Sequence, residues 1–270
     1  MKKLFLSILA TVVIVSLHAQ DSSSVAQPAQ RNKKSSKKEK MQNLMKMEEE
    51  GDLIFNKQTI FGVKLATDGY GLYFEKGKFK TPTRTILYQF ELNEKKSNKE
   101  HHVSFSPDGF NVSSLVPYKT NNFYELKGSI GEQRLIGGKG NKNGVAVMAL
   151  YSGGISLGLL KPYYVNVQDD GTDSTYRRTF AQLQSDTSST ERVTGAAGPF
   201  VGWGHLKVKP GLNGKVAMRF DYGRLNQTIS AIEVGLTGEY YFGKIAQVTL
   251  VPQKQFFFNA YICLLFGSRK

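Results

Sequence analysis

Apolar and polar side chains alternate along most of the chain beyond its N-terminal region. In the clearest segment, Tyr124, Leu126 and Ile130 alternate with Glu125 and Lys127. Successive side chains of a β-strand point to opposite faces, whereas an amphipathic helix needs apolar residues three and four positions apart. The alternation therefore predicts strands with one apolar and one charged face.

Eight segments share this period of two. They are residues 58–67, 69–77, 83–94, 122–134, 143–160, 212–224, 229–242 and 255–267. Each is a weak signal by itself, but an even number of such segments is typical of bacterial membrane barrels. We predict an all-β fold: a closed antiparallel transmembrane β-barrel of about eight strands, with a disordered or helical N-terminal extension.

The connections between these segments alternate in length. Short turns are expected at 77–82, 136–144 and 224–227, and generally longer loops at 67–69, 95–121, 161–211 and 243–254. Outer-membrane barrels have short turns on the periplasmic side and longer loops outside the cell. The connection at 67–69 is the weakest fit, because it is short for an external loop. A short helix is expected at 199–205, inside the third external loop.

The N-terminal region has the composition of an export signal followed by a linker. Lys2 and Lys3 precede an apolar run that ends at Leu17, and Ala19 supplies a small residue before a cleavage point. The run is too short to span a bilayer. We therefore predict a signal peptide at 1–19, a disordered basic linker at 20–57 with a possible short helix at 41–50, and the barrel at 58–268.

Two observations favour a barrel in a membrane over a soluble, lipocalin-like barrel. The apolar faces carry large aromatic residues near strand ends, as membrane interfaces do. They are Tyr70, Phe74, Tyr88, Tyr222, Tyr240, Phe242, Phe256 and Phe266. The other faces carry charges of both signs that could neutralise one another across a narrow lumen: Lys64, Glu75, Glu91, Glu125, Lys127, Arg219, Asp221, Glu233 and Glu239.

Eight strands leave an interior just wide enough for side chains to fill. A diffusion channel is therefore not expected. Acidic residues outnumber basic ones in the inward set, and whether some carboxyl groups are protonated or hydrated stays open at this point. The last strand also presents an apolar face that ends at Phe266, four residues before the C-terminus. It resembles the C-terminal strand that is recognised by the barrel-insertion machinery of Gram-negative outer membranes.

Several blocks carry a family resemblance. Residues 140–147 and 152–164, with shorter blocks at 79–83 and 254–257, are similar to a family of uncharacterised outer-membrane β-barrel proteins from Bacteroidetes. These are small eight-stranded barrels of the OmpA and OmpX type. The resemblance covers roughly residues 58–268 and implies the fold and an outer-membrane location. It brings no catalytic or ligand-binding motif.

The sequence indicates no catalytic, cofactor-binding or metal site. His101, His102 and His205 are expected to be solvated in external loops, and Cys263 falls on the inward phase of the last strand. With one cysteine, no intramolecular disulfide can form. The formal net charge of +14 suits anionic lipid headgroups. No nucleic-acid-binding motif accompanies it, so nucleic acid is not expected as a partner.

The leading hypothesis is a non-enzymatic outer-membrane barrel whose filled body anchors external loops and a periplasmic tail for structural or partner-binding roles. Its expected partners are outer-membrane lipids, the barrel-insertion machinery during biogenesis, and an envelope protein. Two alternatives stay open: an outer-membrane lipid-modifying enzyme using the histidines, and a soluble lipocalin-like barrel that binds a hydrophobic ligand.

Overall fold

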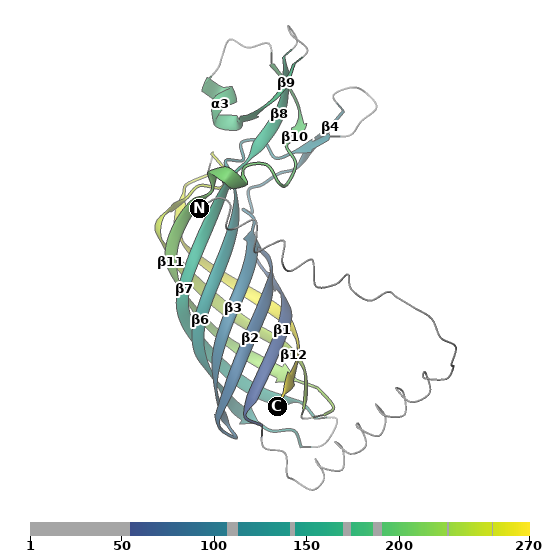
Figure 1. The fold of residues 1–270 in the computed structure, drawn as a ribbon, viewed down its shortest axis with the longest axis vertical. Coiled ribbons are helices and arrows are strands. Elements are labelled where there is room, and N and C mark those ends of the chain that lie inside the picture. Colours follow the sequence, from purple (N-terminus) through teal and green to yellow (C-terminus); the bar gives the residue numbers. More distant parts are fainter. Residues whose placement is uncertain are drawn as a thin grey trace, which may run out of the picture. The chain divides into compact units, whose positions relative to one another are not determined.

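The computed structural model describes residues 55–106, 113–140, 144–169, 174–185, 191–225, 227–249 and 251–270. Eight antiparallel strands close into a barrel in the order β1-β13-β12-β11-β7-β6-β3-β2 (Figure 1). Their bounds are β1 Lys57–Ala66, β2 Gly69–Thr81, β3 Arg84–Lys95, β6 Asn121–Gly137, β7 Ala146–Pro162, β11 Lys207–Asp221, β12 Thr228–Ile245 and β13 Lys254–Arg269. The predicted all-β fold, a closed antiparallel barrel of eight strands, is confirmed, and most of the strands are a few residues longer than predicted.

The first and last barrel strands close the sheet. β1 pairs with β13 from Gln58 opposite Arg269 to Ala66 opposite Tyr261. Closure gives every strand two neighbours, which removes the exposed edges that an open sheet would present. We call the end with the short connections 82–83, 138–145 and 222–227 the turn end, and the opposite end the loop end.

The side chains point as the sequence predicted, with apolar groups outward and charges inward. The side chain of Ile130 is 62% exposed on the outer face, whereas Glu125 is 0% exposed and Lys127 is 3% exposed inside. All nine charged residues predicted to face inward are buried. Seven of the eight predicted aromatics are among the exposed large hydrophobic residues, and Phe74 is half-buried on the same outer phase. A soluble barrel has the opposite polarity.

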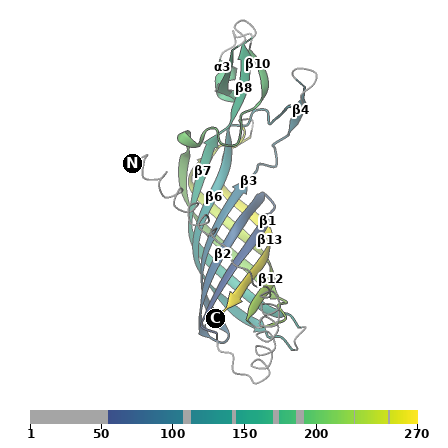
Figure 2. The same ribbon diagram turned by 45° about the vertical axis from the view of Figure 1, so that its right-hand side comes forward.

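The loop end carries ordered structure that the sequence analysis did not predict. Three short strands form a separate sheet in the order β10-β8-β9, and two more form the pair β4–β5. Their bounds are β4 Val103–Phe105, β5 Ser113–Leu115, β8 Tyr164–Asp169, β9 Thr175–Thr179 and β10 Glu191–Ala196, with helix α3 at Phe180–Ser185. Figures 1 and 2 both show these elements beyond the loop end of the barrel, and we call them the extension.

The helix expected at 199–205 is only a 3₁₀ turn, η2, at Trp203–His205. Gly202 precedes it with a φ of 92°, a left-handed conformation that glycine adopts without a steric penalty. Pro199 and the glycines of this segment disfavour a longer helix. No helix in the described ranges is both long and apolar enough to cross a bilayer. The predicted signal peptide, nearly all of the predicted linker and its predicted helix lie outside the described residues.

Candidate functional site: the filled lumen and the loop-end surface

Arg219 is the centre of the largest polar cluster in the lumen. Its five N–H groups make six hydrogen-bond contacts, one N–H of Nη2 being shared, to Glu75, Glu233, Gln133 and Tyr73. The shortest, to one carboxylate oxygen each of Glu75 and Glu233, are both 2.7 Å long. Arg219 lies on β11 and Glu75 on β2, which stand opposite each other in the ring of strands. The guanidinium therefore crosses the lumen and ties its walls together.

A second cluster surrounds Glu91 on β3. Lys64 Nζ lies 2.8 Å from Glu91 Oε2, and Lys215 Nζ lies 3.2 Å from Glu91 Oε1. Lys215 also lies 3.6 Å from Glu233, which accepts a hydrogen bond from the Tyr261 hydroxyl. This cluster connects directly to the one around Arg219.

The third cluster lies nearer the loop end. Lys127 bridges Glu239 at 2.5 Å and Glu125 at 3.0 Å, and Lys95 also pairs with Glu239. The Tyr241 hydroxyl donates to Glu125. The free volume beside Lys95, Lys127 and Glu239 is only about 10 Å³, no more than a single water needs. The buried side chains of Lys95, Lys127, Glu125 and Glu239 fill the lumen at this level.

The predicted excess of lumenal carboxylates is wrong, because the inward set lacked three cations. Each of the three is buried and pairs with a carboxylate already in that set. They are Lys95 with Glu239, Lys215 with Glu91, and Arg269 with Asp221. With them, six cations face the six predicted carboxylates. Burying charges costs several kcal/mol per ion unless each is paired, and this balance meets that requirement without protonated carboxyl groups.

A strap of backbone crosses the mouth of the barrel at the loop end. The backbone amides of Thr120 and Asn121 donate to the carbonyl of Gln247, and the Thr249 amide donates to the carbonyl of Tyr118. The Gln247 side chain donates in turn to the carbonyl of Lys95. The connection from β12 to β13 is thereby fastened to the segment before β6, above the third cluster.

The outer face has an aromatic and cationic contact where β7 meets the loop before β11. The rings of Tyr124 and Trp203 stack with centroids 5.5 Å apart, and Lys161 Nζ lies 5.4 Å from the Trp203 centroid. Lys161 also donates to the carbonyl of Pro199 at 2.6 Å. The neighbouring Phe200 is 88% exposed. Tryptophan beside a cation at the end of an apolar belt is typical of a membrane interface.

The base of the extension rests on Tyr163, between β7 and β8. The Val116 amide donates to the Tyr163 hydroxyl at 3.2 Å, and burial raises the pKa of Tyr163 above its usual value. Tyr163 also donates its own backbone amide to Thr120. The extension is therefore joined to the loop that ends at β6 and to the strap.

The remaining residues singled out from the sequence are placed as follows. His101, His102 and His205 are exposed, and within the described ranges no hydrogen bond joins a serine to any of them. Cys263 is buried and faces inward, as predicted. Among the described residues, no group of three or more metal-ligating side chains could hold a metal ion.

No family model and no curated protein matches this sequence. Two solved structures of Ail, the attachment invasion locus protein of Yersinia pestis, match over 80% of this chain and 100% of that chain, at 9% sequence identity. Their TM-scores are 0.34 and 0.36, the latter for Ail in complex with the heparin analogue sucrose octasulfate. A likeness of this size bears on neither function nor location. The similarity of residues 140–164 to the Bacteroidetes barrel family stays a prediction.

Proposed function

We propose that this chain is a non-enzymatic barrel of the outer membrane that holds the extension on the outer side of the membrane as a partner-binding surface. The observation that carries the proposal is the polarity of the barrel. Its outer face presents large apolar side chains, and its lumen is packed with paired charges. A surface of that kind is stable in contact with lipid and unfavourable in contact with water.

The same observation argues against the soluble alternative. A hydrophobic ligand would need an apolar cavity inside the barrel, and the described lumen is filled by clusters around Arg219, Glu91 and Lys127. The lipid-modifying alternative needs a nucleophile hydrogen-bonded to a base. The exposed His101, His102 and His205 give it no support.

The extension is the part of the described chain best suited to contact a partner. Its central strand β8 pairs with β10 on one side and β9 on the other, and β10 has a bulge between Val193 and Gly195. Val165 and Val167 are fully buried within it. The extension thus consists of paired strands with buried valines, and it is not a set of open loops. A rigid surface loses less conformational entropy on binding than a loop does.

Cell fractionation with protease treatment of intact cells tests the location. We expect the chain in outer-membrane fractions, with faster gel migration when unheated because the barrel resists detergent. External protease should cut in the extension and leave the barrel protected. A water-soluble periplasmic pool would contradict the proposal.

A deletion tests the role of the extension. Replacing residues 164–196 by a short glycine-serine linker leaves the β7–β11 pairing untouched, since that pairing ends at Lys207 opposite Leu160. We expect the variant to fold and insert, and to lose the envelope partners that chemical cross-linking captures with the full chain. Unchanged cross-linked partners would show that the β10-β8-β9 sheet and α3 do not carry binding.

A further inference from the structure

The barrel wall has a notch at the loop end. β1 ends at Ala66, opposite Tyr261 of β13, and the Thr67 amide makes a last bond to the carbonyl of Ala260. Residues 254–259 of β13 therefore have β12 on one side and no strand of β1 on the other. Backbone groups of alternate strand residues point to the same edge, so those of Phe258 and Phe256 face the notch.

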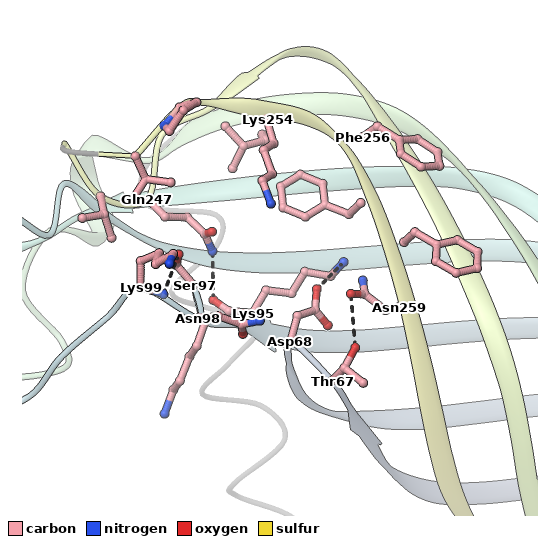
Figure 3. Close-up of a pocket in the computed structure, with 17 residues that line it drawn as sticks. Thr67, Asp68, Lys95, Ser97, Asn98, Lys99, Gln247, Lys254, Phe256 and Asn259 are labelled. Carbon is pink, nitrogen blue, oxygen red and sulfur yellow. Dashed lines mark hydrogen bonds and ion pairs between the residues drawn. The ribbon is translucent and has the colours of Figure 1, made fainter.

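A pocket of about 360 Å³ occupies this notch (Figure 3). It is lined by Asp68, Lys95 and Asn259, and by the strap residue Gln247. Figure 3 shows Lys254 reaching over the space in which Gln247 and Lys95 lie. A volume of this size accepts a small-molecule headgroup.

The pocket has an excess of positive charge. Lys95 is neutralised by Asp68, 3.1 Å away, and by Glu239. Lys96, Lys99 and Lys254 also line the pocket and are exposed. No carboxylate in the described ranges forms an ion pair with any of these three. They therefore remain available to an anion.

One wall of the pocket faces the apolar belt. The side chains of Phe256 and Phe258 point outward and are 59% and 64% exposed. Both also line the pocket. The lining of one pocket thus combines three lysines that have no carboxylate partner among the described residues with two aromatic rings that lipid chains would cover. The Lys96 ammonium also lies 5.3 Å from the centroid of the Tyr70 ring. An anionic lipid carries the complementary groups: a phosphate that pairs with lysines, and acyl chains that pack against aromatic rings.

We propose that the notch binds the phosphate-bearing headgroup of an anionic lipid from the leaflet at the loop end, with its acyl chains against Phe256 and Phe258. The proposal rests on the membrane location proposed above. Lys96, Lys99 and Lys254 hold the phosphate, and the free backbone amides of the β13 edge supply further donors. The site selects for negative charge, since a zwitterionic headgroup brings its own cation among the lysines.

The test measures lipid binding by native mass spectrometry. The full chain is folded in a neutral detergent and titrated with dipalmitoyl phosphatidic acid or dipalmitoyl phosphatidylcholine. We expect retained phosphatidic acid and little phosphatidylcholine. The triple variant Lys96→Gln, Lys99→Gln, Lys254→Gln should bind phosphatidic acid about 10- to 100-fold more weakly, in line with the contribution of a lysine near an anionic lipid.

A matched control removes the same charge elsewhere at the same end of the barrel. Lys207→Gln, Lys209→Gln, Lys244→Gln changes three lysines on β11 and β12 that do not line the notch. We expect its affinity to stay within about twofold of the parent chain. An equal loss in both triple variants would overturn the proposal, because binding would then follow net charge alone.

Two further experiments distinguish lipid binding from binding of a free anion, and loss of binding from misfolding of the variant. Phe256→Ala with Phe258→Ala should weaken phosphatidic acid binding, and inorganic phosphate should compete poorly. Strong competition by phosphate with no effect of the phenylalanines would also overturn the proposal. Heat-modifiable migration of every variant shows whether the barrel is intact. If the barrel inserts normally but retains no anionic lipid, the proposal of a lipid site is wrong. The proposed membrane location is not affected by that result.

Discussion

At the scale of single residues, Arg219 shows how one side chain holds the lumen together. Its exposed fraction is 1%, and its partners Glu75 and Glu233 are fully buried. Removing one member of a buried ion pair leaves the other charged and unsolvated, which costs more than the pair itself contributes. The stability of the barrel should therefore respond far more strongly to Arg219 than to an ion pair on its surface.

We expect Arg219→Met to lower the free energy of unfolding by about 3–5 kcal/mol, because two carboxylates lose their main partner. Urea unfolding in lipid vesicles, followed by loss of the heat-modifiable band, measures this. Arg84→Gln is the control, since Arg84 pairs with Glu132 on the outer surface with its side chain 53% exposed, and it should change stability little. Equal effects of the two substitutions would show that the lumenal network is not stabilising in this way.

Gly158 is a second position where a single residue decides packing. A Cβ there would lie 2.9 Å from the Phe123 ring and 3.0 Å from the Tyr241 ring, whereas a Cβ at Gly153 on the same strand would come no closer than 3.7 Å to Asn213. We expect Gly158→Ala to destabilise the barrel by about 1–3 kcal/mol through overpacking. Gly153→Ala should be close to neutral, as the same unfolding assay will show. Similar losses at both glycines would assign the effect to strand propensity instead.

At the scale of elements, the segment 199–205 joins the extension to the barrel and lies on the outer face. Trp203 stacks on Tyr124 of β6, and Phe200 has almost no protein cover. An aromatic residue so exposed beside an apolar belt is stable if it enters the membrane interface. If the barrel lies in a membrane as proposed, we expect this segment to set the depth of its loop end in the bilayer.

Trp203 is the only tryptophan of the chain, so its fluorescence reports on this segment alone. In vesicles we expect strong quenching by lipids brominated near the headgroup and weaker quenching by lipids brominated deep in the chain. The control variant Trp203→Phe, Phe180→Trp moves the fluorophore to α3 in the extension, where bromolipids should not quench it. Quenching of the control but not of Trp203 would show that α3, and not the segment 199–205, lies in the membrane.

The barrel strands could be predicted from sequence, but the extension could not. Membrane strands alternate over ten or more residues because each side faces a different medium. β8 alternates too, with Val165 and Val167 buried between polar Asn166 and Gln168. That pattern is only a few residues long and lies inside a stretch of loop composition. Short strands of this kind are fixed by their partners rather than by their own sequence.

At the scale of the whole molecule, the lumen is closed at several levels. The clusters around Arg219, Glu91 and Lys127 fill it, and the strap at Gln247 covers its mouth. Because each cluster joins strands that are not neighbours in the ring, opening a path for water would require breaking buried ion pairs. The ion pairs therefore oppose opening of the barrel body.

We expect no resolvable single-channel steps when the folded chain is inserted into planar bilayers. Removing the strap by replacing residues 246–253 with a short glycine turn should leave the barrel closed, because the block at Lys95, Lys127 and Glu239 lies below it. Steady ohmic steps from the parent chain would contradict a filled lumen. Steps from the strap deletion alone would assign the closure to the strap.

The sequence by itself determined the number of strands and their approximate bounds, because the period of two is a local property of the backbone. Its aromatic and charged residues indicated which face of each strand points outward. It placed Glu91, Arg219 and Cys263 inside the barrel. Only the tertiary structure decided that Arg219 contacts Glu75 and that three more lysine and arginine side chains balance the lumenal carboxylates. It also decided that β13 extends beyond the end of β1 at the loop end, which leaves a notch. Those facts depend on the stagger of strands around a closed ring, which brings together residues more than a hundred positions apart.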